Sequence, residues 1–244
     1  MSFTCIRVTF TPGEAIRDEL VRRGIAHAAL WGRGVDPHFF HPGRRDHSWR
    51  RWLAGGDDTV VVLHVGRLAH EKNLGVLIEA WRQARAALGQ RATFVVAGEG
   101  PEAQRIEARL PFVRLLGFLP REDLATLYAS ADVCVFPSHT ETCGLVALEA
   151  MAAGTAVIAA DAGGFRESIQ PGTTGLLVPA HEPRTYSDAI VALTNDPAAR
   201  FALAAAARDY ALSRDVAVEN AELLERYAAL TDAAQQPRST TCAA

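Results

Sequence analysis

Short runs of apolar residues alternate with segments of helical periodicity over most of this chain. Residues 60–65 are apolar except for one histidine, a pattern typical of a strand that is buried on both faces of a parallel sheet. In residues 73–88, apolar side chains instead recur every three or four positions, which predicts a helix with one buried face. The pattern therefore predicts strands and helices in regular succession.

This alternation of strand-like and helix-like segments continues through the rest of the chain. Strands are predicted at residues 60–65, 93–97, 113–116, 133–136, 156–160 and 175–178, the last at a sheet edge. Helices are predicted at residues 73–88, 102–110, 121–130, 145–153, 165–169, 198–212 and 215–230. Regular alternation with short loops indicates an α/β fold with a Rossmann-like, doubly wound parallel sheet. Ligands of such sheets bind beyond the carboxyl ends of the strands.

The two ends of the chain differ from this core. In the first 55 residues, a helix is predicted at 13–23, a strand at 26–30, and a loop rich in Gly, Pro, His and Arg at 32–51. We expect residues 1–55 to be a junction segment packed on the core. Residues 56–230 should form the Rossmann-like domain, and the small, polar residues 231–244 a disordered tail.

Composition favours a globular protein over several other classes. Of the 244 residues, 49% are apolar, and the net charge of −3 gives no electrostatic basis for binding a nucleic acid. No apolar run approaches the roughly 18–20 residues that a membrane span requires. The four cysteines follow no metal-ligand spacing, so we expect reduced thiols, no bound metal and a cytoplasmic location.

The most informative segment runs from Pro137 to Ala159. Glu141 and Glu149 stand eight positions apart there, and Gly144 between them opens a predicted helix that follows a strand and a polar loop. The first amides of a helix lack internal partners and lie at its positive end, so this arrangement predicts an anion site. Carboxylates accept hydrogen bonds from hydroxyl groups, so two of them beside an anion site predict a ligand with hydroxyl groups on both sides of a phosphate. A nucleotide sugar is such a ligand.

Two further loops follow predicted strands. In the first, Gly66 and Arg67 precede Lys72, and two cations at the end of a strand suit a diphosphate. The alternative is a pair of solvated surface cations. In the second loop, Gly98 belongs to a Gly-x-Gly that serves either a tight turn or close approach to a base or ribose. Glu149 has apolar neighbours, so it must meet either a cation of the fold or a ligand.

These motifs together resemble one family. The ensemble is similar to the C-terminal, nucleotide-sugar-binding domain of family 4 retaining glycosyltransferases with the two-domain GT-B fold, and particularly to GDP-mannose-dependent mannosyltransferases. The matching segments are WGRGVDPHFFHP (31–42), VGRLAHEKN (65–73), VVAGEGP (95–101), LGFLPREDLATLYASADVCVFPS (116–138), TETCGLVALEAMAAGTAVIA (140–159) and GGFRESIQPGTTGLLV (163–178).

The resemblance implies a role for each matching residue. Arg67 and Lys72 would bind the diphosphate and stabilise the charge of the leaving nucleotide, and Glu141 would hold the donor sugar; these three are the expected catalytic residues. Glu149 would bind the ribose hydroxyls, and the amides of residues 144–146 would cap the distal phosphate. The expected donor-binding residues are Gly66, Gly98, Phe118, Leu119, Gly144, Leu145, Val146 and Glu149. The resemblance implies no protein nucleophile, no metal and no cofactor beyond the nucleotide-sugar donor.

One departure from the family pattern concerns length. A complete enzyme of this kind carries an N-terminal acceptor-binding domain, and we expect that domain to be missing from this chain. The chain would then be a fragment, a truncated reading frame or a subunit of a split enzyme. Two functions stay open: a hexosyltransferase whose other half lies elsewhere, and a nucleotide-sugar-binding module without turnover. A GT-B epimerase or phosphorylase fits the glutamate motif less well. Peripheral membrane contact through the absent half and self-association are further expectations.

Overall fold

A six-stranded parallel sheet forms the centre of the protein. The computed structural model describes residues 8–32, 34–56 and 58–235. The strand order is β5-β4-β3-β6-β7-β8, and every neighbouring pair is parallel. The strands are β3 (Val60–Val65), β4 (Ala92–Ala97), β5 (Arg114–Leu115), β6 (Val133–Phe136), β7 (Ala156–Ala160) and β8 (Leu176–Val178). The predicted doubly wound α/β fold is confirmed, and β8 lies at the edge as predicted.

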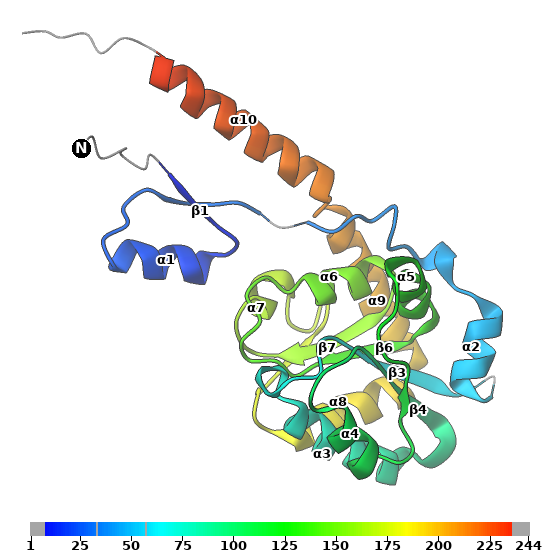
Figure 1. The fold of residues 1–244 in the computed structure, drawn as a ribbon. Helices are drawn as coiled ribbons and strands as arrows, with labels where there is room; N and C mark the ends of the chain where they lie inside the picture. Colours follow the sequence, from blue (N-terminus) through cyan, green and yellow to red (C-terminus); the bar gives the residue numbers. More distant parts are fainter. Residues whose placement is uncertain (1–7, 33, 57, 236–244) are drawn as a thin grey trace, which may run out of the picture.

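Helices cover both faces of this sheet (Figure 1). The helices of the core are α2 (His47–Ala54), α3 (Leu74–Leu88), α4 (Ala103–Arg109), α5 (Arg121–Ser130), α6 (Leu145–Ala152), α7 (Phe165–Ser168), α8 (Pro183–Asn195) and α9 (Pro197–Leu212). Alternate residues of β3 enter two separate cores: Val61 and Leu63 pack with α5 and α6, whereas Val60 and Val62 pack with α3 and α8. Burial on both faces explains why β3 is apolar almost throughout.

The predicted loop at residues 32–51 is wrong in its second half. Residues 42–44 form a 3-10 turn, and α2 begins at His47. The carboxylate of Asp46 accepts hydrogen bonds from the amides of Ser48 and Trp49, and Gly55 ends the helix with a φ of 71°. An Asp at the N-cap and a Gly at the C-terminus are ordinary helix signals, and the abundance of Arg and His between them obscured the short apolar face of Leu53.

The N-terminal residues divide into two parts. Residues 34–54 pack on the core: Val35 and Phe40 are buried there, and Arg208 of α9 donates a hydrogen bond of 3.0 Å to the carbonyl oxygen of Phe40. Residues 8–32 instead form a small unit of their own. It contains β1 (Thr9–Thr11), α1 (Glu14–Arg22) and β2 (Ala28–Leu30), and its two strands pair in parallel.

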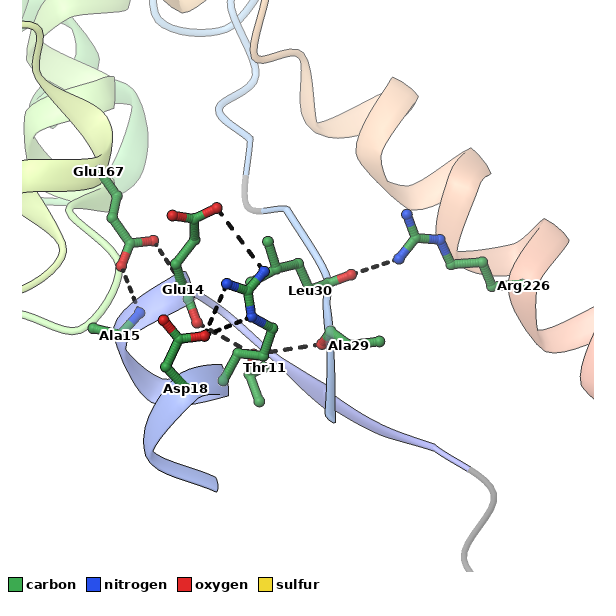
Figure 2. Close-up of polar contacts among 10 residues, drawn as sticks. Thr11, Glu14, Ala15, Asp18, Ala29, Leu30, Glu167 and Arg226 are labelled. Atoms are coloured by element: carbon green, nitrogen blue, oxygen red, sulfur yellow. Dashed lines mark hydrogen bonds and ion pairs between the residues drawn. The ribbon is translucent and has the colours of Figure 1, made fainter. Parts of the chain in front are cut away.

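This small unit lies beside the C-terminal helix α10 (Val216–Gln235) (Figure 1). The rings of Phe10 and Tyr227 meet edge to face at 5.4 Å, and Arg226 donates to the carbonyl oxygen of Leu30. Figure 2 shows the link to the core: the carboxylate of Glu167 accepts hydrogen bonds from the first amides of α1. Because α10 runs to Gln235, the tail predicted from residue 231 begins too early; residues 236–244 lie outside the described residues.

Candidate functional site

Two cavities adjoin at the carboxyl ends of β3, β4 and β6. Their shared wall consists of Val65, the last residue of β3, and of Gly66 and Arg67 directly after it. The first cavity has a volume of about 350 Å³ and is lined by Val65, Gly66, Arg67, Ala97, Gly98, Glu99, Phe118, Leu119 and Leu124. The second has a volume of about 330 Å³ and is lined by His64, Val65, Gly66, Arg67, Lys72, Phe136, Ser138, Glu141, Val146 and Phe165. Most of the predicted site residues therefore meet at one edge of the sheet.

The two glycines of the first cavity pack against each other. Gly98 has a φ of 136°, and a Cβ atom on it would overlap the carbonyl oxygen of Gly66. The amide of Gly66 in turn donates to the carbonyl oxygen of Ala97 at 3.1 Å. Gly98 thus serves the close approach of two loops that wall the cavity. Phe118, which is 72% exposed, offers an aromatic surface at the opening.

The second cavity contains an ion pair between two of the predicted catalytic residues. The Lys72 ammonium lies 3.0 Å from Oε2 of Glu141, and their side chains are only 26% and 15% exposed. Arg67 is far more exposed, and its guanidinium pairs with Glu71. Sequence reasoning missed Glu71. An acid four residues after an Arg in a loop leading to a helix would have been a signal for this pair.

Gly144 starts α6 in the left-handed conformation, with a φ of 66°. A Cβ atom there would lie 2.6 Å from Oγ of Ser168, which donates to the carbonyl oxygen of Cys143 at 3.2 Å. The amide of Gly164 also donates to the carbonyl oxygen of Glu141 at 2.7 Å. The glycine-rich segment after β7 therefore fixes the loop that carries Glu141 and leads into α6.

Glu149 lies one turn further along α6 and faces α5. The hydroxyl of Tyr128 donates to Oε2 of Glu149 at 3.3 Å. Burial raises the pKa of Glu149 from 4.5 to about 7, although the hydrogen bond from Tyr128 and the positive charge of Arg121 oppose this rise. Glu149 does not belong to the lining of either cavity described above, and Leu145 packs partly into the core.

His64 is a further buried residue of the second cavity that sequence reasoning missed. Its Nδ1 lies 2.8 Å from the carbonyl oxygen of Val135, and its Nε2 is buried with no hydrogen-bond partner. Burial lowers the pKa of His64 to about 4, so the imidazole is neutral at pH 7. A neutral ring that donates from Nδ1 presents Nε2 as an acceptor. The one polar residue in an otherwise apolar strand was the available signal.

Comparison with known families identifies the family of the chain. Residues 48–210 match the model of the glycosyl transferases group 1 family. The chain belongs to this family. Its α/β sheet and the expected relationship to GT-B glycosyltransferases are thereby confirmed.

Two curated relatives illustrate the relationship. The chain is 37% identical over 224 residues to a GDP-mannose-dependent alpha-mannosyltransferase of Mycobacterium tuberculosis, covering 91% of this chain and 56% of that protein. It is 43% identical over 192 residues to a D-inositol 3-phosphate glycosyltransferase of Geodermatophilus obscurus, covering 73% of this chain and 42% of that protein. This group 1 glycosyl transferase chain thus spans about half the length of these relatives.

Solved structures of other proteins have the same fold. The Anabaena protein HepE, in complex with UDP and glucose, superposes with a TM-score of 0.80 at 24% identity, over 91% of this chain and 63% of that one. A sucrose-phosphate synthase from Thermosynechococcus elongatus superposes with a TM-score of 0.77 at 28% identity, over 92% and 58%. Both cover this group 1 chain almost completely and extend well beyond it.

Two negative observations apply to the described part of the chain. No helix there is both long and apolar enough to span a bilayer. No three side chains among its His, Cys, Asp and Glu residues gather where a metal ion could be held. Cys134 is a buried free thiol and Cys143 a partly exposed one, whereas Cys5 and Cys242 lie outside the described residues.

Proposed function

We propose that this chain is the donor-binding half of a family 4 retaining glycosyltransferase that transfers a hexose from a nucleotide sugar, with GDP-mannose the favoured donor. The observation that carries the proposal is the pair of cavities joined at Gly66 and Arg67. One offers apolar and aromatic surface, and the other an ammonium and a carboxylate. A nucleotide sugar has the matching sequence of parts: a flat base, a diphosphate and a polyol.

The donor would lie across both cavities. Its base would occupy the first cavity, against Phe118 and Leu119, because an exposed aromatic ring can stack on a planar base. Its diphosphate would cross the shared wall at Arg67, and its sugar would enter the second cavity beside Lys72 and Glu141. The GDP-mannose-dependent relative, 37% identical to this chain, supports mannose as the hexose.

Transfer with retention is proposed from the resemblance of the motifs to the retaining family. In this reaction the bond between the anomeric carbon and the phosphate oxygen breaks, and a bond from that carbon to the acceptor hydroxyl oxygen forms on the same face. The hydroxyl proton passes to the departing phosphate. Negative charge grows on that phosphate, where Arg67, Lys72 and the amides of residues 144–146 would stabilise it. The proposal therefore assigns no step to a metal, a cofactor or a protein nucleophile.

Lys72 and Glu141 form a pair that the donor would rearrange. In the structure the ammonium of Lys72 is 3.0 Å from the carboxylate of Glu141, so each group compensates part of the other's charge. A bound diphosphate would draw Lys72 toward itself, and Glu141 would then accept hydrogen bonds from sugar hydroxyls. Arg67 would exchange Glu71 for phosphate oxygens in the same way.

We assign the acceptor site to a separate half that docks on the small N-terminal unit and α10. The chain spans 56% of the mannosyltransferase relative, so that relative has room for a second domain of similar size. Leu224 and Tyr227 of α10 are 68% and 50% exposed, and Val21 of α1 is 47% exposed. Unburied apolar area of this kind also favours self-association when the other half is absent. We place the activity in the cytoplasm, with any membrane contact made by the acceptor half.

Calorimetric titration tests donor binding directly. Wild-type chain is titrated with GDP-mannose, UDP-glucose, GDP and UDP, and GDP-mannose should bind most tightly. Arg67→Ala should weaken GDP binding about tenfold or more, because a charge-assisted hydrogen bond is lost. Arg82→Ala is a matched control, since Arg82 is also an exposed arginine paired with a nearby glutamate on its own segment. Equal losses in both variants, or no binding of any nucleotide, would refute the donor site.

A turnover assay separates the two candidate functions. The chain spans about half the length of its relatives, which favours donor binding without sugar transfer when the chain is alone. We expect at most slow donor hydrolysis from the purified chain, because closure over the acceptor normally excludes water and positions the hydroxyl. Transfer should appear when an acceptor-binding half is added. Robust transfer by the chain alone would contradict the assignment of the acceptor site to another half.

A further inference from the structure

A basic cavity lies at the amino ends of the strands, on the side of the sheet opposite the carboxyl ends where the donor cavities lie. It has a volume of about 250 Å³ and is lined by Arg45, His47, Arg50, Arg51 and Gly56. These residues belong to α2, to the turn before it and to the turn that connects it to β3. The cavity therefore adjoins the amino ends of the strands, whereas the donor cavities adjoin their carboxyl ends.

Arg50 is the fixed centre of this cavity. Its Nη2 donates to the carbonyl oxygen of Thr59 and pairs with Oδ2 of Asp132, both at 2.7 Å. Its side chain is only 14% exposed, and its buried Nη1 has no hydrogen-bond partner among the residues that the structure describes. A guanidinium held on one side by the fold therefore has donor capacity left on the other side.

The described residues that line the cavity include three arginines and no carboxylate. Asp132 is the carboxylate that pairs with Arg50, and it lies 3.9 Å from Arg45 as well. A second nearby carboxylate, Asp46, accepts hydrogen bonds from two amides of α2. Two of the three arginines, Arg45 and Arg50, thus share Asp132, and Asp58 lies two positions after Gly56 in the chain. Burial lowers the pKa of Arg50, and the neighbouring charge of Arg45 adds to this effect.

We propose that this cavity is a second anion site, and that it binds a phosphate monoester group. Guanidinium groups bind phosphate oxygens in pairs of parallel hydrogen bonds, and a dianionic phosphate would balance the excess charge of Arg45 and Arg51. The volume accommodates a phosphate with a few attached atoms. The phosphate could belong to a small soluble molecule or to a lipid headgroup. The site is independent of the proposed donor chemistry, which lies at the other edge of the sheet.

The test uses the full chain with Lys72→Ala, so that phosphate binding in the donor cavities is weakened. Inorganic phosphate and glycerol 3-phosphate are titrated calorimetrically. In this background Arg45→Gln with Arg51→Gln should weaken both ligands at least tenfold. The control pair, Arg82→Gln with Arg105→Gln, removes the same charge from exposed arginines elsewhere and should change binding less than twofold. Thermal unfolding checks that both double variants are folded.

A second arm identifies the source of the phosphate. Co-sedimentation compares vesicles of phosphatidylcholine with vesicles that also contain phosphatidic acid, whose headgroup is a phosphate monoester. Vesicle binding that is lost in Arg45→Gln with Arg51→Gln assigns the site to a lipid headgroup. Binding of the soluble ligands alone assigns it to a small molecule. Absence of binding to every probe, or equal losses in the two double variants, would overturn the proposal.

Discussion

Replacement of Glu149 by Gln should stabilise the ligand-free protein at pH 8 and leave its stability at pH 4 unchanged. Glu149 is largely buried, and it accepts a hydrogen bond from the hydroxyl of Tyr128 at 3.3 Å. Its pKa in the folded chain is about 7, against 4.5 for an ordinary glutamate. At about 1.4 kcal/mol for each pH unit, this difference corresponds to about 3 kcal/mol.

The sign follows from proton binding. Below pH 4.5 Glu149 is protonated in both the folded and the unfolded state, so it adds no pH dependence. Between pH 4.5 and 7 the folded state keeps its proton while the unfolded state has lost it, and the free energy of unfolding falls as the pH rises. Gln mimics the neutral acid at every pH. The variant should therefore gain stability over wild type across this window and hold that gain above pH 7.

Urea unfolding at pH 4, 6 and 8 measures this effect. At pH 8 the variant should be more stable by about 2–3 kcal/mol, which corresponds to about 4–12 °C in Tm for a chain of this size. The resemblance assigns Glu149 to the ribose hydroxyls, although Glu149 lines neither donor cavity; weaker GDP binding by the same variant would support that role. Tyr128→Phe is the comparison variant, since it removes the hydrogen bond that lowers the pKa of Glu149 and should extend the loss of stability to higher pH. A loss of stability at pH 8, or a difference independent of pH, would refute the reasoning.

Three further predictions concern the donor cavities. Lys72→Ala should weaken GDP binding by about 1.5–3 kcal/mol but leave guanosine unaffected, because only GDP carries phosphates; equal losses in titrations of both ligands would indicate an effect on folding. Glu141→Gln should weaken GDP-mannose and spare GDP in the same assay, and an equal loss of both would contradict its role at the sugar. Gly98→Ala should lower the free energy of unfolding by about 2–4 kcal/mol, because the new Cβ would overlap the carbonyl oxygen of Gly66 at a positive φ; an unchanged urea midpoint would show that the two loops can separate.

Local pattern was sufficient to predict most of the core. The strands at 60–65, 133–136 and 156–160 have the predicted bounds, because residues buried on both sheet faces must be apolar almost without interruption. The site edge was also predictable, since the loops that follow parallel strands collect at one edge. Lys72 and Glu141 are 69 residues apart in sequence, yet they form an ion pair in the second cavity.

The partners of individual side chains were decided by tertiary structure. The sequence shows that Glu149 has apolar neighbours, but only the packing of α6 against α5 brings the Tyr128 hydroxyl to it. The burial that comes with this packing raises the pKa of Glu149. Gly98 was predicted to approach a ligand or to form a turn, and only the fold shows that it also packs against Gly66 in the wall of the first cavity. These contacts join segments distant in sequence, so no local pattern encodes them.

The arrangement of the two ends of the chain also depends on tertiary contacts. A helix at 13–23 could be predicted from sequence, whereas its N-terminal cap could not, because Gly13 has no side chain and the capping carboxylate comes from Glu167 in α7. Residues 8–32 lie beside α10 because Phe10 meets Tyr227 and Arg226 reaches Leu30. The sequence by itself determined the sheet and the edge that carries the site. The tertiary structure alone determined which groups distant in sequence form ion pairs, cap a helix or limit each other by steric overlap. The energies of these interactions depend on distance in space and not on distance along the chain.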